Sequence, residues 1–289
     1  MDIVLNFGAQ EALEALPPRS IALDGYCRGP QIDLANDRYS FDHHDNCIRH
    51  VTSATCQQVM DAILVGFDPA GYRIYVNDID ADTVLSVFLL QQPHRARDPK
   101  VRTLIEAVGK VDSHGPSYDL PEHLAKLADD YLEHALAPER TQRKQGTYGQ
   151  GEAGLRELLD VCLERTVKFL AGTLEPRVPR TPTPYTVLFS EGDLALITGD
   201  REMMGRAYRE GNWKKIVAML PAKDGTHAFT IAKRSEFVKW DVPKVLRALH
   251  AREPGWGGGS TVGGAPRNPD GTRSRLTAAE VWEIVRKNG

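Results

Sequence analysis

A dense series of prolines near the middle of the chain constrains its fold more than any other feature. Prolines stand at positions 176, 179, 182 and 184. Proline lacks an amide hydrogen and fixes φ, so neither a helix nor a central strand can pass through this segment. We therefore interpret residues 172–185 as an extended, semi-rigid linker between two folded parts.

The residues before the linker alternate between strand-like and helical patterns. Short apolar runs typical of strands cover 20–23, 38–41 and 73–76, and apolar spacing typical of helices covers 53–64 and 83–90. This alternation favours an α/β fold with a parallel sheet. We expect a first domain over 1–130, followed by a helical connector and the linker over 131–184.

The residues after the linker predict a smaller α/β domain over 185–289. Its strand-like runs and helical patterns cover 186–189, 194–198, 215–220, 228–232, 243–250 and 277–287. The last helix has a capping-box pattern, because Glu280 follows Thr277 by three residues.

Composition excludes several classes of protein. Of the 289 residues, 41% are hydrophobic and 26% are charged, which argues against general disorder. The longest apolar runs are too short to cross a membrane, and the N-terminus lacks the basic region of a signal peptide. The four cysteines show no CxxC spacing, so we expect reduced thiols in a cytoplasmic protein.

The charge is unevenly distributed along the chain. The net charge of −3 combines 20 acids and 11 bases in residues 1–130, a balance of −9, with 19 acids and 25 bases in residues 131–289, a balance of +6. An acidic part can bind cations and a basic part can bind anions. Two unrelated solvated surfaces remain the alternative interpretation.

The strongest local signal is the run Phe41-Asp42-His43-His44-Asp45, which follows a strand-like segment. Carboxylates and neutral imidazoles are suitable ligands for Mn²⁺, Mg²⁺, Fe²⁺ or Zn²⁺. An exposed polar turn is the alternative interpretation. Since short motifs are hypotheses, the run is a candidate metal site that needs supporting residues elsewhere.

A second acidic group, Asp78, Asp80 and Asp82, lies between the apolar run 73–76 and an apolar helix. Neighbouring carboxylates repel one another unless a cation neutralises them. The alternative is that one aspartate, most readily Asp82, caps the helix while the others face solvent.

Two single aspartates complete the acidic set. We interpret Asp24 and Asp112 as residues that follow strands, a position where one aspartate alone is usually a turn residue. Together with the two clusters, they would lie at one edge of a single sheet, where open α/β sheets bind ligands. His114 lies close to Asp112 and could act as acid, base or orienting partner.

A glycine-rich segment near the C-terminus is the last signal. Gly257, Gly258 and Gly259 precede Ser260, and glycines allow backbone amides to approach an anion closely. A flexible surface loop is the alternative. Residues 234–289 hold 10 bases and 6 acids, which favours an anionic ligand.

Together these motifs resemble the DHH phosphoesterase superfamily, which is named for the tripeptide present here as Asp42-His43-His44. Asp80-Ala81-Asp82 is similar to the family's Asp-x-Asp element, although here it follows the tripeptide, which implies a permuted motif order. Asp24 resembles the family's lone strand-end aspartate and Asp112 its later aspartate. The C-terminal motifs resemble the DHH-associated domain, with Ser260 in place of the usual histidine.

The resemblance implies a DHH-like catalytic lobe with a parallel sheet and a smaller substrate-binding α/β lobe. It implies a dinuclear metal centre, with two Mn²⁺ ions as the first expectation and Mg²⁺ or another divalent metal as alternatives. The implied metal ligands are Asp24, Asp42, His43, Asp78, Asp80, Asp82 and Asp112. The implied catalytic residues are His44 and His114. The implied substrate-binding residues are Arg234, Ser235, Gly257, Gly258, Gly259 and Ser260.

The expected activity is hydrolysis of a phosphodiester or phosphoanhydride bond in a small phosphorylated molecule or short oligonucleotide. An acidic first domain and only 7% aromatic residues disfavour long nucleic acid as a partner. A non-catalytic metal- or nucleotide-binding protein on the same fold is the alternative, and an unrelated α/β protein with chance motifs is the third. We expect no membrane partner. The sequence allows a homodimer but does not specify one.

Overall fold

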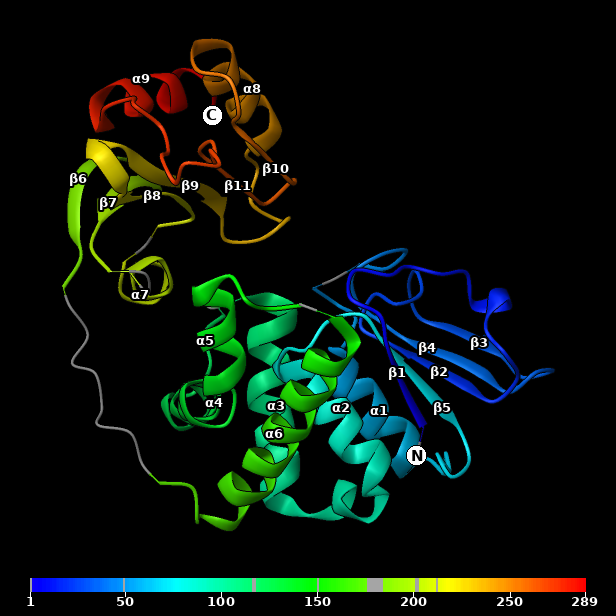
Figure 1. Cartoon of the computed structure of the whole chain (residues 1–289). Helices are drawn as coiled ribbons and strands as arrows, with labels where there is room; N and C mark the ends of the chain where they lie inside the picture. The colour runs from blue at the N-terminus through cyan, green and yellow to red at the C-terminus, as the bar shows by residue number, and fades with distance from the viewer. Residues whose placement is uncertain are drawn as a thin grey trace. The chain divides into compact units, whose positions relative to one another are not determined.

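The computed structural model of the chain describes residues 2–48, 50–115, 118–149, 151–175, 184–200, 203–211 and 213–289. The chain divides into two compact units, Met1–Val178 and Pro179–Gly289, each with its own sheet (Figure 1). Three of the four prolines of the expected linker, at positions 176, 179 and 182, lie outside the described residues.

The first unit contains a five-stranded sheet with the order β1-β5-β2-β4-β3. Its strands are β1 (Asp2–Leu5), β2 (Ser20–Leu23), β3 (Gln31–Asp33), β4 (Arg38–Phe41) and β5 (Arg73–Val76). Four neighbouring strands run parallel, and β3 pairs antiparallel with β4 at the edge. The α/β class expected from the sequence is therefore confirmed, although the sheet is mixed rather than purely parallel.

The two faces of this sheet pack against different parts of the chain. Ile21 and Ile74 face a large core formed with the helices. Ala22 and Tyr75, next to them in sequence, face a smaller cluster that includes Leu13 of the short 3-10 helix η1 (Leu13–Ala15). This alternation follows from the two-residue period of a strand.

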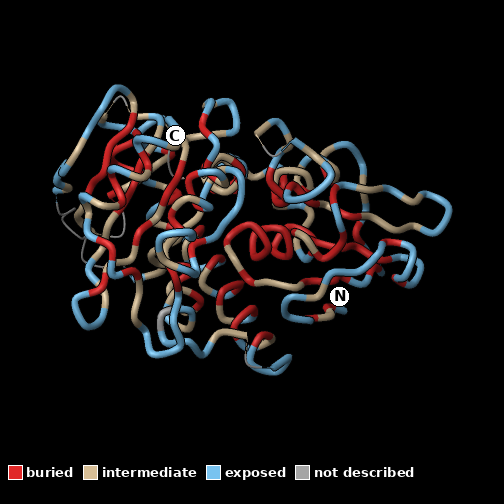
Figure 2. Tube along the Cα trace, turned by 90° about the horizontal axis from the view of Figure 1, so that it is seen from above, coloured by how far each residue is buried: buried red, intermediate tan, exposed pale blue. Residues whose placement is uncertain are grey.

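Helices cover one face of the sheet (Figure 1). They are α1 (Thr55–Leu64), α2 (Ala81–Gln91), the 3-10 helix η2 (Pro93–Arg97), α3 (Pro99–His114), α4 (Glu122–His134), α5 (Ala137–Gln145) and α6 (Gly151–Ala171). Helix α2 is buried along the ten consecutive residues 81–90, most of which are apolar. Such fully buried segments are red in Figure 2.

The helices that follow residue 121 share the core of the first unit. Tyr131 of α4 and Leu159 of α6 are fully buried in the same cluster as the strand residues Ile21 and Ile74. The helical part of the expected connector at 131–184 therefore packs as part of the first unit.

The second unit contains a six-stranded sheet with the order β10-β11-β9-β8-β7-β6. Its strands are β6 (Thr186–Glu191), β7 (Leu194–Thr198), β8 (Lys215–Pro221), β9 (His227–Lys233), β10 (Gly257–Gly258) and β11 (Val262–Gly264). Among the described strands of this second sheet, only β7 and β8 pair parallel. This unit too is α/β.

Helices cover both faces of the second sheet. Leu196 faces the core shared with α8 (Val242–Arg252) and α9 (Ala278–Asn288). Its neighbour Ile197 faces α7 (Met203–Glu210). The predicted capping box is confirmed, since the Thr277 hydroxyl accepts the Glu280 amide at 3.3 Å and the Glu280 carboxylate accepts the Thr277 amide at 2.9 Å. No described helix in either unit has the length and apolar character needed to cross a bilayer.

Candidate metal centre

The parallel strands of the first unit end at one edge of the sheet, and the acidic residues come directly after them. Leu23 at the end of β2 pairs with Phe41 at the end of β4. Asp24 and Asp42 therefore leave the sheet at the same level. Strand β5 pairs with β2 on its other side and leads into the Asp78–Asp82 cluster. Register thus brings three of the four acidic signals together, at the edge where open α/β sheets bind ligands.

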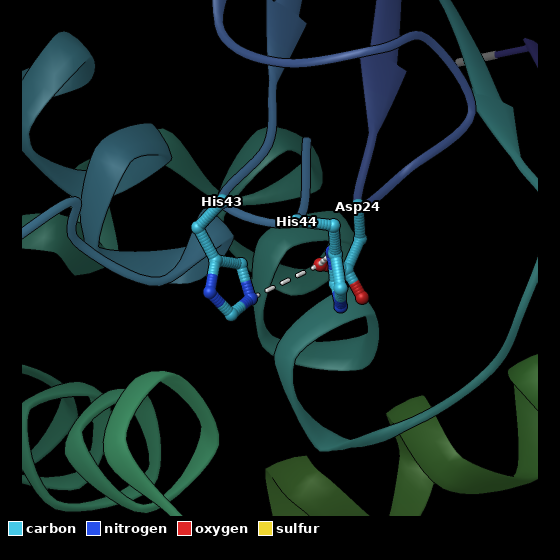
Figure 3. A group of neighbouring side chains, drawn as sticks. All are labelled: Asp24, His43 and His44. Carbon is cyan, nitrogen blue, oxygen red and sulfur yellow. Dashed lines mark ion pairs between the residues drawn. The ribbon is translucent and has the colours of Figure 1, made fainter. Parts of the chain in front are cut away.

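His43 lies at the centre of this arrangement and is fully buried. Its Nε2 atom lies 2.7 Å from Oδ2 of Asp112, 3.5 Å from Oδ1 of Asp24 and 3.5 Å from Oδ2 of Asp82. Figure 3 shows Asp24, at the end of its strand, with the His43 and His44 side chains converging on it. One imidazole therefore contacts carboxylates from three separate elements of the fold.

Asp24 is itself held in place by the helices. Its Oδ1 accepts a hydrogen bond from the Thr55 hydroxyl at 3.0 Å, and its Oδ2 accepts one from the Thr83 hydroxyl at 3.4 Å. Its φ of 50° lies in the left-handed region, which aspartate tolerates better than most residues. Asp24 is buried, so its carboxylate is fixed and largely withdrawn from water.

Asp42 is fully buried, and its carboxylate accepts hydrogen bonds from the backbone of the surrounding loops. Its carboxylate accepts the amide of Gly29 at 2.8 Å and the amide of His44 at 3.0 Å, and it lies 2.9 Å from Nδ1 of His44. Burial alone would raise its pKa, but these bonds to His44 and Gly29 outweigh burial and lower the pKa to about 2. Asp42 therefore stays ionised and orients His44, whose side chain is 37% exposed.

Two groups of side chains have the spacing of metal ligands. Asp24, His43 and His44 form the first, and His43, Asp82 and Asp112 form the second. In each group the candidate ligand atoms lie within 4.8 Å of one another. Hard carboxylate oxygens mixed with imidazole nitrogen fit Mn²⁺, Mg²⁺ or a similar divalent ion better than a thiophilic metal.

Asp80 and Asp82 cap two different helices, which differs from the alternative interpretation in which Asp82 caps its own helix. Asp80 is the N-cap of α2, where its side chain accepts the amide of Thr83 at 2.9 Å. Asp82 reaches across to the start of α1 and accepts the amides of Thr55 and Cys56, each at 2.8 Å. Asp82 is fully buried, so both helix ends are joined at the candidate centre.

The electrostatics of this cluster favour a bound cation. Burial raises the pKa of Asp80 well above its ordinary value, and Asp24, Asp112 and Asp82 raise it further. Burial, followed by Asp24 and Asp112, raises the pKa of Asp82 to about 7. Among the described residues, no lysine or arginine forms an ion pair with Asp24, Asp80 or Asp82. His43 lies 3.5 Å from both Asp24 and Asp82, and His44 lies 3.4 Å from Asp24. A divalent ion would reduce the repulsion among these carboxylates.

Asp112 belongs to the cluster, but its local structure differs from the expected strand end. Helix α3 continues to His114, so Asp112 lies in the last turn of a helix. The interpretation of Asp112 as a residue that follows a strand is therefore wrong. The carboxylate nevertheless reaches His43.

His114 lies at the end of the same helix and contacts aromatic neighbours. Its ring centroid lies 5.8 Å from that of His50 and 4.5 Å from that of Tyr118, and its Nδ1 lies 2.8 Å from the Ser113 hydroxyl. Burial, then the charge of Lys110, lowers the pKa of His114. A neutral imidazole two residues after Asp112 can accept a proton, but none of these contacts joins it directly to His43.

Asp78 is placed apart from the two ligand groups. Its Oδ1 accepts a hydrogen bond from Arg143 at 2.8 Å and another from the Tyr148 hydroxyl. These partners lie in α5 and in the segment before α6. The expected metal ligand is therefore engaged with side chains far along the chain.

The candidate substrate-binding residues all lie in the second unit. Gly257 and Gly258 form β10, and the amide of Gly259 donates to Val262 at 2.8 Å. The Ser260 hydroxyl donates to Glu236, and the amide of Arg234 donates to the Lys214 carbonyl at 2.8 Å. The glycine-rich segment is thus a β-hairpin rather than a loose loop.

Close packing explains part of this glycine content. A Cβ atom on Gly258 would collide with Gly263 across the hairpin, and one on Gly263 would collide with Leu246 of α8. Gly257 and Gly259, in contrast, have open space where a side chain would begin.

Sequence reasoning missed several residues that hold the centre together. Thr55 contacts both Asp24 and Asp82, and Gly29 donates its amide to Asp42. Arg143 and Tyr148 hold Asp78. A threonine at the start of a predicted helix is a weak signal for such a role, and the other three carry no local signal.

Comparison of the chain with protein-family models and with curated protein sequences finds no match.

The pH dependence of stability depends on the groups with shifted pKa values. The pKa of His43 is about 10, because the bonds to Asp112 and Asp24 outweigh burial, against an ordinary value of 6.5. The pKa of Asp82 is about 7 against 3.8. A raised folded-state pKa gives stability that is present at low pH and lost as pH rises through it. The lowered pKa of Asp42 has the opposite effect on stability. It gives stability that is lost only as the pH falls below about 4.

We therefore expect the metal-free protein to lose stability steadily from about pH 5 to about pH 9. Mn²⁺ should stabilise the protein more strongly at the upper end, because it replaces bound protons. Melting temperatures measured across this range with a chelator and with excess Mn²⁺ test the expectation. A chelator-treated protein whose stability rises with pH throughout would contradict it.

Proposed function

We propose that the first unit is a metal-dependent phosphoesterase of the DHH type, with a DHH-like catalytic lobe and a dinuclear centre. The observation that carries the proposal is the convergence of Asp24, Asp82 and Asp112 on the fully buried His43. Such a cluster is costly in a bare protein and favourable around divalent cations. Mn²⁺ is the metal that this donor set favours first, with Mg²⁺ as the alternative.

The ligands would come from two sides of His43. Asp24 and His44 would bind on one side, and Asp82 and Asp112 on the other, as the two ligand groups indicate. Asp80 would complete the set from the N-terminus of α2. Bound divalent ions would supply charge stabilisation on the attacking and leaving oxygens of the phosphoryl group and a lowered pKa for water.

His44 is the side chain best placed to act on the substrate. It is partly exposed, and Asp42 fixes its ring through Nδ1. An imidazole oriented in this way can contact a phosphoryl oxygen or carry a proton between the substrate and solvent. Asp42 is the positioning residue for this step, since its carboxylate remains ionised across the working pH range.

The substrate we propose is a small phosphorylated molecule or a short oligonucleotide, cleaved at a phosphodiester or phosphoanhydride bond. In the second unit, Arg234 and the open positions Gly257 and Gly259 are the proposed contacts for its phosphate groups. Backbone amides next to glycines without a neighbouring side chain can approach an anion closely.

The deciding experiment combines metal analysis with a substrate panel. Elemental analysis of the purified protein should find about two divalent ions per chain after incubation with Mn²⁺. Turnover should then appear with a chromogenic phosphodiester, pyrophosphate, a linear dinucleotide or a cyclic dinucleotide. Metal binding without turnover of any of them would favour the non-catalytic alternative, and absence of metal binding would refute the metal-dependent phosphoesterase.

A further inference from the structure

The loop that carries the acidic cluster is tied to a distant part of the first unit through Asp78. Asp78, Arg143 and Tyr148 form a contact that we call the Asp78 brace. The Tyr148 hydroxyl donates to Oδ1 of Asp78 and accepts the amide of Ile79 at 2.6 Å. Arg143 donates to the same Oδ1 at 2.8 Å and to the Ile79 carbonyl at 3.5 Å.

The brace is a built structure rather than a chance surface pair. The Arg143 guanidinium lies 3.9 Å from the centroid of the Tyr148 ring, and its Nε atom donates to the buried carboxylate of Glu139. The other side of Tyr148 packs edge-on against Phe7, with ring centroids 5.4 Å apart. Arg143 and Tyr148 are thus fixed by contacts with Glu139 and Phe7 that do not involve the loop.

The loop needs such support because it leads directly into the carboxylates of the candidate centre. Only Asp78 and Ile79 lie between Asn77, which bonds to Ala9, and Asp80, the N-cap of α2. Asp80 and Asp82 are fixed near Asp24 and Asp112, where ionised carboxylates repel one another. A contact that holds the backbone of residues 78 and 79 resists the outward movement that this repulsion favours.

We infer that Arg143 and Tyr148 are positioning residues that preorganise the metal ligands Asp80 and Asp82 without touching the metal. The inference rests on the proposed metal centre. It assigns Asp78 to the brace instead of to the ligand set. Residues that orient ligands from outside typically change metal affinity by about 10- to 100-fold when they are altered.

The test is a set of Mn²⁺ titrations by calorimetry on chelator-treated full-length protein, with melting temperatures measured in parallel. Tyr148→Phe removes only the hydroxyl, and Arg143→Gln removes the charge from a side chain that is 40% exposed. Each should weaken Mn²⁺ binding at least about tenfold, while the metal-free melting temperature changes by no more than about 2 °C. Arg143→Lys should recover part of the loss.

A control and a double variant separate the brace from general stability and from direct ligation. Arg140→Gln breaks an ion pair between Arg140, which is in the same helix as Arg143, and Glu133, and it should leave Mn²⁺ affinity unchanged. Asp78→Asn should match Tyr148→Phe, and the two together should cost little more than either alone, because they remove one interaction. A direct ligand would instead give a larger, additive loss.

The outcomes are distinguishable. Wild-type affinity in both Tyr148→Phe and Arg143→Gln overturns the brace and leaves the proposed function standing. A loss of affinity that only accompanies an equal loss of metal-free stability also overturns it. Failure of the wild-type protein to bind Mn²⁺ refutes the proposed function and the brace together. If Tyr148→Phe does not fold, Arg143→Gln and its lysine counterpart decide the question.

Discussion

Replacing Asp80 with asparagine should abolish metal-supported phosphoesterase activity and raise the melting temperature of the metal-free protein. Asparagine caps a helix about as well as aspartate, so the bond to Thr83 can survive the change. The substitution removes one acidic group from a cluster in which burial, Asp24 and Asp112 already raise the pKa of Asp80. If the weaker repulsion raises the free energy of unfolding by about 1 kcal/mol, the melting temperature rises by about 2–4 °C.

The measurement is a thermal melt at about pH 8 after chelation, together with turnover in Mn²⁺. Asp98→Asn is the matched control, since Asp98 is also an N-cap aspartate, on α3, and lies outside the cluster. It should leave both activity and the melting temperature nearly unchanged. Normal activity in Asp80→Asn, or a lower metal-free melting temperature, would argue against the assignment of Asp80 to the centre.

Replacing His43 with alanine should also abolish metal retention, but it should destabilise the metal-free protein. His43 is fully buried, and contacts with Asp112 and Asp24 raise its pKa to about 10. Its imidazolium therefore neutralises part of the carboxylate charge when no metal is bound. Removing one partner from a buried charged cluster costs about 3–5 kcal/mol.

Metal retention is measured by elemental analysis and stability by a thermal melt below about pH 9, where His43 remains charged. We expect Mn²⁺ affinity to fall by more than about 100-fold. His123→Ala, at an exposed position of α4, serves as the control and should change neither quantity. Full metal content in His43→Ala would refute the centre. Opposite effects of Asp80→Asn and His43→Ala on the metal-free protein distinguish a charge cluster from a generic core defect.

The parts of the fold that depend on local patterns were predictable. The strand-like runs 20–23, 38–41 and 73–76 match β2, β4 and β5 in the structure, because each apolar run stops at an aspartate or asparagine. Strand β1 was missed, since four residues near an acidic start give little periodic signal. Strand β3 was missed for a similar reason, as only Ile32 separates its polar ends.

The part of the candidate site that was predictable is the part that the pairing of neighbouring parallel strands brings together. Asp24 and Asp42 follow parallel neighbours, so their proximity is a property of the sheet. The bonds from Asp82 to α1 and from Asp78 to α5 join residues that lie far apart in the sequence, and no local pattern specifies them. The helical position of Asp112 was not predicted, because a short apolar run is equally compatible with a helix and with a strand.

The joining of two helix starts by Asp80 and Asp82 has an electrostatic consequence for the fold itself. Helices α1 and α2 both begin at the carboxylate cluster. The N-terminus of a helix carries about half a positive charge from its aligned peptide dipoles. Two such ends supply a fixed positive potential that belongs to the backbone, so no side-chain substitution can remove it. The two helix ends therefore stabilise the acidic centre whether or not a cation is bound.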